Sequence, residues 1–418
     1  MLFSKFMLYS KFGILAAISL CNAFTVLPEP NRQLASTAAS FIPIPTHAPK
    51  RWVHPGVFVN AKQLDFVSEK VARSAEPWSN AFSSMMNYNY SSPSRTAVPY
   101  KTVECGPTST PNIGCYQERE DSMAAYINSL AYWITKERKY AEKAIYYMDA
   151  WSSTIQGHSN SNSPLQAAWS AANWVRAGEL MRYAPGGGWS RKGIQKFENM
   201  LTEVYLSIVL PGDTANNGNW DLVMMESSLG IAVFTENKTT YEDAMSKFAG
   251  RVPAYIYLTS DGPYPVPGRG VKDTPAALIK YWQGQQYFNI SGITQETCRD
   301  YAHTSYGISS ISHIAETSRI QGEDLWLTNL GVRVAAALEL HASFETGQEP
   351  IPDFICGGHI ERSMDPVLEP SYNALAYRMH KRMPYTLRFL MQQRPAEIGE
   401  PEPLFIGFET VTNAKIPF

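Results

Sequence analysis

The chain has 418 residues, 44% of them hydrophobic, so it can bury a large core and is not intrinsically disordered. A formal net charge of −2, without any tract rich in Lys and Arg, excludes the electrostatic pattern of a nucleic-acid-binding protein. Aromatic residues make up 12%, and such rings commonly line sugar-binding grooves, although large cores contain them too.

The N-terminus has the pattern of a secretory signal peptide. Lys5 and Lys11 lie among apolar residues, an apolar stretch follows, and small residues near Ala23 offer a cleavage site. We therefore predict a signal peptide over 1–24 and a secreted, extracellular protein with no membrane partner. Residues 25–50, rich in Pro, Ser and Thr, are predicted to form an arm before the folded domain.

Cleavage would remove Cys21 and leave an even number of cysteines, which in an exported protein predicts two disulfides. Cys105 and Cys115 form the natural local pair, which leaves Cys298 with Cys356. None has the spacing with His that a zinc site needs, so no metal is predicted. N-glycosylation sequons, which fit a eukaryotic secretory route, begin at Asn89, Asn237 and Asn289.

From residue 61 onward, apolar residues recur at helical spacing. Short loops rich in Gly, Pro, Ser and Asn separate the segments, as antiparallel helix pairs require. The main predicted helices span 61–73, 121–135, 140–155, 164–183, 191–209, 219–233, 241–257, 273–288, 296–321, 324–346 and 371–393. Strand-like alternation is nearly absent, which predicts an all-α fold.

So many helix pairs favour an α/α toroid, in which inner helices line a cleft and outer helices cover them. Residues 51–394 are predicted to form this single catalytic domain. The segment 95–116 is predicted to be a loop, and the tail, 395–418, is predicted to pack along the outside of the domain.

The predicted helix 296–321 carries the densest group of reactive side chains. Arg299, His303 and Tyr306 fall at i, i+4 and i+7 and would share one face. A cation, an imidazole and a phenol together indicate a site, although they could also form a hydrogen-bond network between helices. His313 and Glu316, further along, are expected to tie the helix to a neighbour.

A second polar stretch, which contains Asn216 and Asn217, opens directly into a predicted helix that starts near Trp220. Asn at such a position is also an ordinary helix cap, and Asn-Gly is an ordinary turn. The loop therefore has both a structural and a functional interpretation.

The order of several motifs over about 52–394 resembles that of the alginate lyase family of polysaccharide lyases. The motifs are His54-Pro-Gly-Val, Gly106-Pro, Asn112-Ile-Gly-Cys115, Asp149-Ala-Trp-Ser152, Asn216-Asn217-Gly-Asn-Trp220, Arg299 to Gly307, and Tyr372-Asn373 with Pro384-Tyr-Thr386. The resemblance implies a secreted α/α-toroid enzyme that cleaves uronic-acid polymers by β-elimination.

The resemblance also implies roles for individual residues. In such lyases an Arg and a Tyr seven residues apart lie in the cleft, as Arg299 and Tyr306 would, and Asn217 matches the Asn that binds the uronate carboxylate. In the best-known branch a His follows that Asn, whereas this chain has Gly218. His303 could replace the missing imidazole in space.

The chemistry explains why these residue types belong together. The C5 proton of a uronate is poorly acidic until the neighbouring carboxylate is neutralised, which Arg299 and Asn217 could do. Tyr306, with a pKa lowered by Arg299, could take this proton and protonate the leaving O4. His303 could assist Tyr306 or the carboxylate, or act as base if the two proton transfers need opposite faces.

We expect no cofactor, a monomer, and an acidic β-1,4-linked polysaccharide substrate, either mannuronate-rich alginate or glucuronan. Further substrate contacts are predicted from Asn216, Trp220, His359, Tyr372, Asn373 and Tyr264. One alternative is an α/α-barrel glycoside hydrolase, which needs two carboxylates such as Glu118, Asp121 or Asp300. The other is a non-catalytic carbohydrate-binding protein of the cell wall.

Overall fold

A computed structural model describes residues 42–395, 397 and 404–418. The predicted signal peptide and most of the predicted arm lie outside these residues. Two hydrogen bonds attach the described end of the arm to the folded domain: the backbone N–H of Asn329 donates to the carbonyl oxygen of Ile42 at 3.0 Å, and that of Ala48 donates to Glu242 at 3.2 Å. Among the described residues, no helix combines the length and the apolar character needed to cross a membrane.

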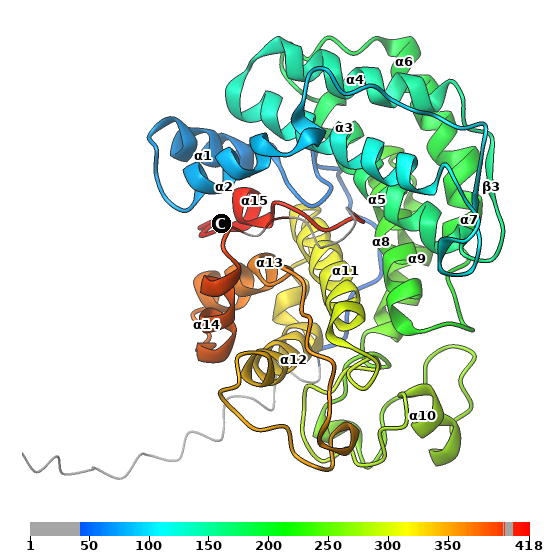
Figure 1. Cartoon of the computed structure of the whole chain (residues 1–418), viewed down its shortest axis with the longest axis vertical. Helices are drawn as coiled ribbons and strands as arrows, with labels where there is room; N and C mark the ends of the chain where they lie inside the picture. Colours follow the sequence, from blue (N-terminus) through cyan, green and yellow to red (C-terminus); the bar gives the residue numbers. More distant parts are fainter. Residues whose placement is uncertain (1–41, 396, 398–403) are drawn as a thin grey trace, which may run out of the picture. The chain divides into compact units, whose positions relative to one another are not determined.

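Four long helices, buried on almost all sides, form the inner layer of the fold (Figure 1). They are α3 (Cys115–Thr135), α5 (Ser163–Arg182), α8 (Gly218–Phe234) and α11 (Tyr301–Ile320). Each packs on the next, α3 on α5, α5 on α8 and α8 on α11. A helix with apolar or small residues on every side is stable only when neighbours cover it all round, as they cover α5, in which every residue from Leu165 to Met181 is buried.

Amphipathic helices cover this inner layer. In α4 (Arg138–Ser152), which packs on α3, the buried residues Ala141, Ala144, Met148 and Trp151 recur at helical spacing. The other helices are α1 (Ala61–Ala72), α2 (Trp78–Asn87), α6 (Arg191–Asn199), α7 (Ser207–Val209), α9 (Lys238–Arg251), α10 (Pro275–Tyr281), α12 (Asn329–Glu345), α13 (Glu369–Tyr372), α14 (Pro384–Gln393) and α15 (Glu409–Asn413). The predicted all-α toroid class is confirmed.

The segment predicted to be a loop contains short strands. β1 (Thr102–Cys105) pairs antiparallel with β2 (Asn112–Ile113) and parallel with β3 (Gly157–Ser159), in the order β2-β1-β3. The Cys105–Cys115 disulfide closes the β1–β2 turn, and Cys298–Cys356 is the second bond, so both predicted pairings are confirmed.

Two predicted helices differ from the observed ones in an informative way. The helix predicted over 296–321 begins at Tyr301, because the Asp300 side chain caps it by accepting the backbone N–H of His303 at 2.7 Å. The helix predicted over 371–393 is instead α13, a π-helical stretch and then α14 from Pro384, since a proline disfavours helix in the residue before it and suits the first turn.

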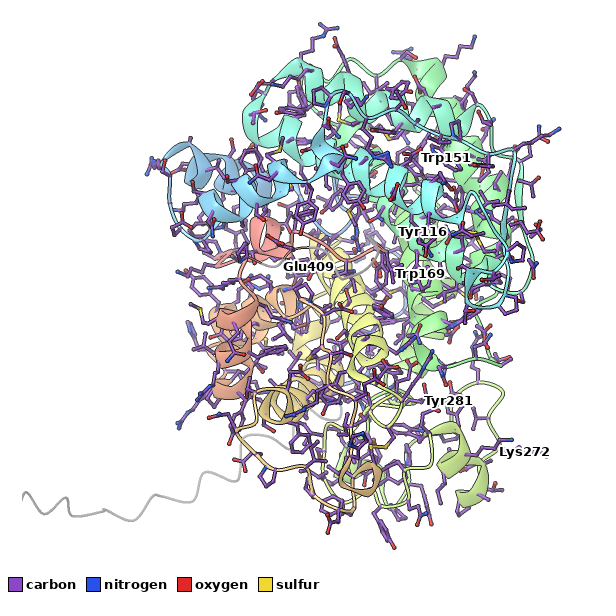
Figure 2. The ribbon with its side chains drawn as sticks, in the orientation of Figure 1. Tyr116, Trp151, Trp169, Lys272, Tyr281 and Glu409 are labelled. Carbon is purple, nitrogen blue, oxygen red and sulfur yellow. A yellow bond between two sulfur atoms is a disulfide. The ribbon has the colours of Figure 1, made fainter. Side chains whose placement is uncertain are left out.

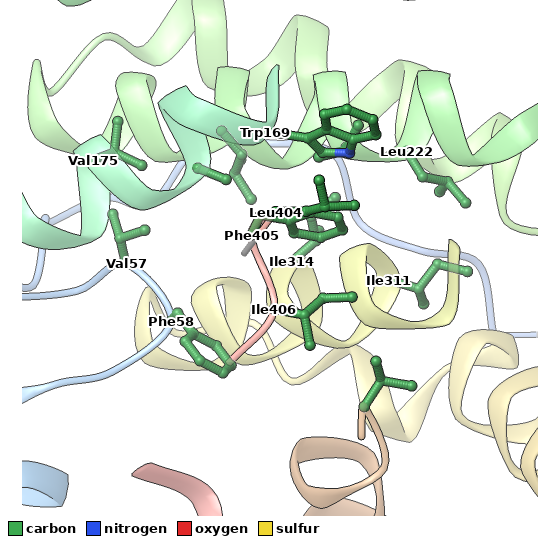
Figure 3. Packing of buried hydrophobic residues seen from close by; sticks show 14 of the residues in the cluster. Val57, Phe58, Trp169, Val175, Leu222, Ile311, Ile314, Leu404, Phe405 and Ile406 are labelled. Atoms are coloured by element: carbon green, nitrogen blue, oxygen red, sulfur yellow. The ribbon is translucent and has the colours of Figure 1, made fainter. Parts of the chain in front are cut away.

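Residues 404–414 of the C-terminal tail are buried inside the fold, whereas the sequence predicted that the tail packs along the outside. In Figure 3, Leu404, Phe405 and Ile406 run between α11 and the pair α5 and α8. Two inner-helix side chains hold this backbone: Asn173 Nδ2 donates to the Leu404 carbonyl and Arg176 Nη1 to the Phe405 carbonyl, each at 2.8 Å. The apolar side chains of the tail are buried because they fill the centre of the helical layer.

Candidate active site

A cavity of about 570 Å³ lies where the inner helices α3, α5, α8 and α11 meet the tail. Its lining residues are Pro107, Thr108, Ser109, Arg119, Ser161, Asn162, Leu165, Trp169, Asn216, Asn219, Trp220, Arg299, His303, Tyr306 and Leu404. The set includes two guanidinium groups, one imidazole and one phenol, and no carboxylate. The cavity therefore suits an anionic ligand.

Arg299 reaches the cavity from the residue before the N-cap of α11, and not from the helix face that the sequence predicted. Its Nη1 donates to Oε1 of Glu296 at 3.0 Å, and its side chain is 32% exposed. The guanidinium is thus anchored at one end and open to the cavity at the other, which fits a group that binds a carboxylate.

His303 and Tyr306 do share the face of α11 that lines the cavity. Their ring centroids are 5.4 Å apart, and Tyr306 also lies edge-on to Phe405 of the tail at 6.4 Å. The structure therefore brings Arg299, His303 and Tyr306 together.

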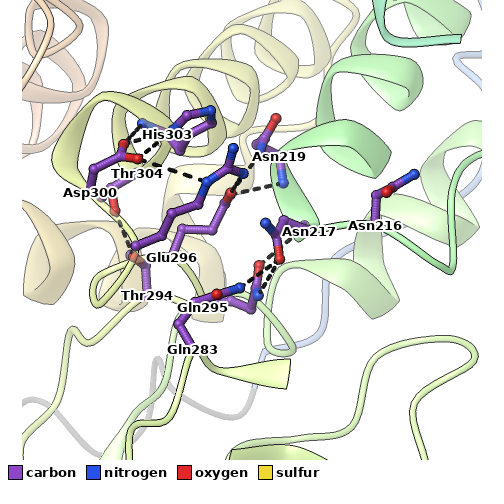
Figure 4. Close-up of polar contacts among 12 residues, drawn as sticks. Asn216, Asn217, Asn219, Gln283, Thr294, Gln295, Glu296, Asp300, His303 and Thr304 are labelled. Atoms are coloured by element: carbon purple, nitrogen blue, oxygen red, sulfur yellow. Dashed lines mark hydrogen bonds and ion pairs between the residues drawn. The ribbon is translucent and has the colours of Figure 1, made fainter. Parts of the chain in front are cut away.

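The Asp300 carboxylate orients the His303 imidazole. Nδ1 of His303 lies 2.7 Å from both carboxylate oxygens (Figure 4), so Nδ1 donates to Asp300 and Nε2 is the ring nitrogen left for the cavity. Burial alone would raise the pKa of Asp300, but the hydrogen bonds from His303 and the charge of Arg299 lower it overall. Asp300 therefore stays ionised beside the ring.

The polar loop before α8 divides its side chains between two directions (Figure 4). Asn216 lines the cavity, whereas Asn217 does not: its Oδ1 accepts from Gln283 at 2.8 Å and from Gln295 at 3.0 Å. Asn219, which the sequence analysis did not single out, is buried and lines the cavity. Its place in the same polar stretch as Asn216 and Asn217 is the signal that could have identified it.

Buried Glu296 joins these two sides of the site. Its carboxylate accepts from Asn219 Nδ2 at 2.6 Å, from Arg299 Nη1 at 3.0 Å and from the Tyr255 hydroxyl at 3.0 Å. Burial raises the pKa of Glu296 despite these partners. Glu296 fixes the positions of the amide and the guanidinium relative to each other.

The structure gives a physical reason for glycine at position 218. A Cβ there would lie 2.4 Å from Cδ2 of Tyr255, and Tyr255 is itself fully buried and bonded to Glu296. An imidazole at this position would displace that ring. The histidine in this cavity is His303 instead, on the opposite helix.

Of the residues predicted to contact substrate, Asn216 and Trp220 line the cavity. The others lie elsewhere. Exposed His359 lines a different cavity beside the Cys298–Cys356 disulfide. Asn373 is buried and donates to the Ile416 carbonyl at 3.2 Å, while Tyr264 packs against Phe288 and Tyr372 against the core. Asn373, Tyr264 and Tyr372 are thus held in place by packing or hydrogen bonds, whereas His359 is exposed at another cavity.

Arg119 and Trp169 are cavity residues that the sequence analysis did not assign to the site. Arg119 is only 2% exposed, and its guanidinium lies 4.7 Å from the Tyr116 ring centroid and 5.5 Å from that of Trp169. An arginine within a helix that is otherwise buried is the signal that could have drawn attention to it.

The carboxylates considered for hydrolysis all have fixed partners. Glu118 is buried against His158 at 2.8 Å and Tyr205 at 2.5 Å, and Asp121 accepts from the Trp151 indole at 2.8 Å. Neither lines the cavity, nor does Asp300. Among the described residues, no group of three or more His, Cys, Asp and Glu side chains is arranged to hold a metal ion.

No protein-family model and no curated protein matches the sequence. Solved structures do. A histidine-to-alanine variant of alginate lyase A1-III complexed with tetrasaccharide has a TM-score of 0.52 at 16% identity, covering 77% of this chain and 85% of that one. The chain has the alginate lyase fold.

Two further structures agree with this assignment. Alginate lyase A1-III from Sphingomonas species A1 has a TM-score of 0.51 at 14% identity, covering 86% of this chain and 96% of that one. An alginate lyase from Bacteroides ovatus has a TM-score of 0.50 at 13% identity, covering 87% and 100%. The cavity described above therefore lies within an alginate lyase fold.

Proposed function

We propose that this protein is a secreted polysaccharide lyase that cleaves a β-1,4-linked polyuronate by β-elimination. One observation carries the proposal: Arg299, His303 and Tyr306 meet in a cavity whose lining includes no carboxylate. A hydrolase needs two carboxylates across its cleft, whereas elimination needs cations beside the uronate carboxylate and a base at C5. The alginate lyase neighbours, one of them holding a tetrasaccharide, support the same substrate class.

In this mechanism Arg299 pairs with the uronate carboxylate and so increases the acidity of the C5 proton. We assign the amide contact to Asn219, because Asn217 is held outside the cavity and Asn219 has a second amide hydrogen beyond the one given to Glu296. Tyr306 takes the C5 proton and then protonates the departing O4, so that one residue serves both steps.

His303 supplies the imidazole next to this carboxylate. With Nδ1 bound to Asp300, its Nε2 is the ring nitrogen that can contact the substrate in the cavity. Asp300 and Glu296 are positioning residues, since each holds a cavity side chain without lining the cavity.

A secretory route accords with the bound cysteines, because disulfides persist in oxidising compartments. The acceptor residues of the three sequons, Asn89, Asn237 and Asn289, are exposed, so each is accessible to glycosylation.

Ultraviolet absorbance tests the reaction class. Elimination creates a C4–C5 double bond conjugated with the carboxylate, which hydrolysis does not form. Incubation of the purified protein with polymannuronate, polyguluronate and glucuronan separately should raise the absorbance on one of them. New reducing ends without absorbance would show a hydrolase, and binding without either signal would show a carbohydrate-binding protein.

A further inference from the structure

The loop that borders the candidate active site also borders a second cavity, of about 400 Å³. Asn216 faces the first cavity, while Thr214, Ala215 and Asn217 line the second. Its remaining walls come from the segment before α10 and from α10 with the residues after it: Gly270, Val271, Lys272, Ala277, Lys280, Tyr281 and Gln283. One polar loop therefore separates the two cavities.

The second cavity is positively charged. Lys272 and Lys280 line it and are exposed, and neither ammonium group has a hydrogen-bond or ion-pair partner in the part of the chain that the structure describes. No carboxylate lines the cavity, and Asp273, next in sequence to Lys272, is not among its lining residues.

Two acidic side chains near the polar loop, Asp213 and Asp221, already have partners. Oδ1 of Asp213 accepts the backbone N–H groups of Ala215 and Asn216 at 2.8 and 2.6 Å. Asp221 binds Arg251 at 2.8 Å and Arg269 at 3.0 Å. Neither aspartate pairs with Lys272 or Lys280.

Hydrogen bonds hold the loop that separates the two cavities, residues 214–217, and the outer part of this loop is exposed. The Tyr281 hydroxyl donates to the carbonyl oxygen of Asn216 at 3.2 Å, and Gln283 Nε2 donates to Oδ1 of Asn217 at 2.8 Å. The exposed residues of this loop are Thr214, Ala215 and Asn216. In the view of Figure 2, Tyr281 lies between Trp169 of the first cavity and Lys272 of the second.

We propose that the second cavity is a subsite in which Lys272 and Lys280 bind carboxylates of the polyuronate chain beyond the linkage that is cleaved. This inference rests on the proposed function, because a polyuronate carries one carboxylate on every residue and a chain that crosses the loop presents more of them. Lysine suits such a subsite, since a flexible ammonium can follow carboxylates whose position varies with the sugar sequence. We call this cavity the lysine subsite.

The lysine subsite makes the enzyme favour polymers over the shortest substrates. The double variant Lys272→Gln/Lys280→Gln should raise KM for the polymer roughly fivefold or more while kcat stays unchanged. Added salt should weaken wild-type turnover of the polymer more than that of the variant, because it screens exposed charges. On the shortest oligosaccharide that is cleaved, the two proteins should have equal KM.

The control is Lys192→Gln/Lys238→Gln, which removes the same charge from exposed lysines of α6 and α9 and should leave KM unchanged. An unaltered polymer KM in the Lys272→Gln/Lys280→Gln protein, or an equal loss on the shortest oligosaccharide, would overturn the subsite. Equilibrium binding of polymannuronate and glucuronan to the wild type and to this variant tests the subsite without turnover, because the variant should bind the polymer more weakly. Absence of unsaturated product from the wild type on every polyuronate would overturn the proposed reaction, and the binding comparison would still decide the subsite.

Discussion

Nε2 of His313 lies 2.6 Å from Oε1 of Glu409, and this contact ties the C-terminal segment to the inner helix α11. Glu409, labelled in Figure 2, belongs to α15, and Nδ1 of His313 lies 3.0 Å from Glu226 of α8. Arg176 of α5 also pairs with Glu226. These four residues form a buried ion cluster in which two positive and two negative charges balance when His313 is protonated.

The cluster predicts how stability depends on pH. Burial lowers the pKa of His313, but the charges of Glu226 and Glu409 raise it more, so the folded-state pKa is above its usual value of 6.5. Stability from this group is therefore complete below pH 6.5 and is lost as pH rises through the higher folded pKa. The melting temperature should fall over that range. The pKa of Glu226 is lowered, so its contribution to stability is lost only in acid, as pH falls below about 4.5.

Glu409→Gln isolates this effect. Removing one partner of a buried ion cluster should cost about 3–5 kcal/mol and should flatten the alkaline fall, because His313 loses a charge that raises its pKa. Thermal unfolding at several pH values measures both quantities. An alkaline slope equal to that of the wild type would assign the pH dependence to other groups.

Asp300→Asn separates the capping role of this residue from its role beside His303. Asn caps helices about as well as Asp, so the melting temperature should change little. The kcat should fall about tenfold or more, because the His303 ring loses the carboxylate that orients it in the cavity.

The matched control is Ser190→Ala, which removes only a helix cap, the bond from Gly193 N–H at 3.0 Å. It should cost about 1 kcal/mol of stability with normal kinetics. If Asp300→Asn lowers stability and leaves kcat at the wild-type level, the role of Asp300 is limited to capping α11.

Periodicity predicted the helical layers and the cluster around Tyr306, because apolar spacing and residue type are local properties. It could not place the helix start at Tyr301, since the Asp300 cap depends on competition between adjacent polar residues. Nor could it show which of two adjacent asparagines faces the cavity, because the partners of Asn217 lie 66 and 78 residues away along the chain. The burial of Leu404 and Phe405 likewise depends on helices that are far from the tail in sequence, such as α5, whose Asn173 and Arg176 bind their carbonyl groups.

Asn219→Ala should mainly lower kcat, whereas Asn217→Ala should mainly lower stability. Asn219→Ala removes the amide beside Arg299 and should lower kcat on the order of 100-fold. Asn217→Ala loses hydrogen bonds from Gln283 and Gln295 and should cost about 1 kcal/mol of stability with a small kinetic effect. Steady-state kinetics and melting temperatures of both variants test the assignment, and a large kcat loss in Asn217→Ala alone would reverse it.

Gly218→His should destabilise the protein and should not improve catalysis. The new side chain would overlap the Tyr255 ring, and overpacking of this kind costs about 1–3 kcal/mol. Displacement of Tyr255 would also disturb Glu296, so kcat should fall. Gly218→Ala, which adds only the Cβ, should show the same direction with a smaller loss. Unchanged stability in both variants would show that Tyr255 can move aside.

The most direct test of the central claim is the rate of unsaturated-product formation by Tyr306→Phe on the polyuronate that the wild type cleaves. The control is Tyr372→Phe, which alters a tyrosine that does not line the cavity. If Tyr306 moves the C5 proton, its variant should lose turnover by about 100-fold or more, still bind the polymer and keep its melting temperature, while Tyr372→Phe should turn over normally. Turnover near the wild-type level in Tyr306→Phe would contradict the assignment of Tyr306 as acid and base.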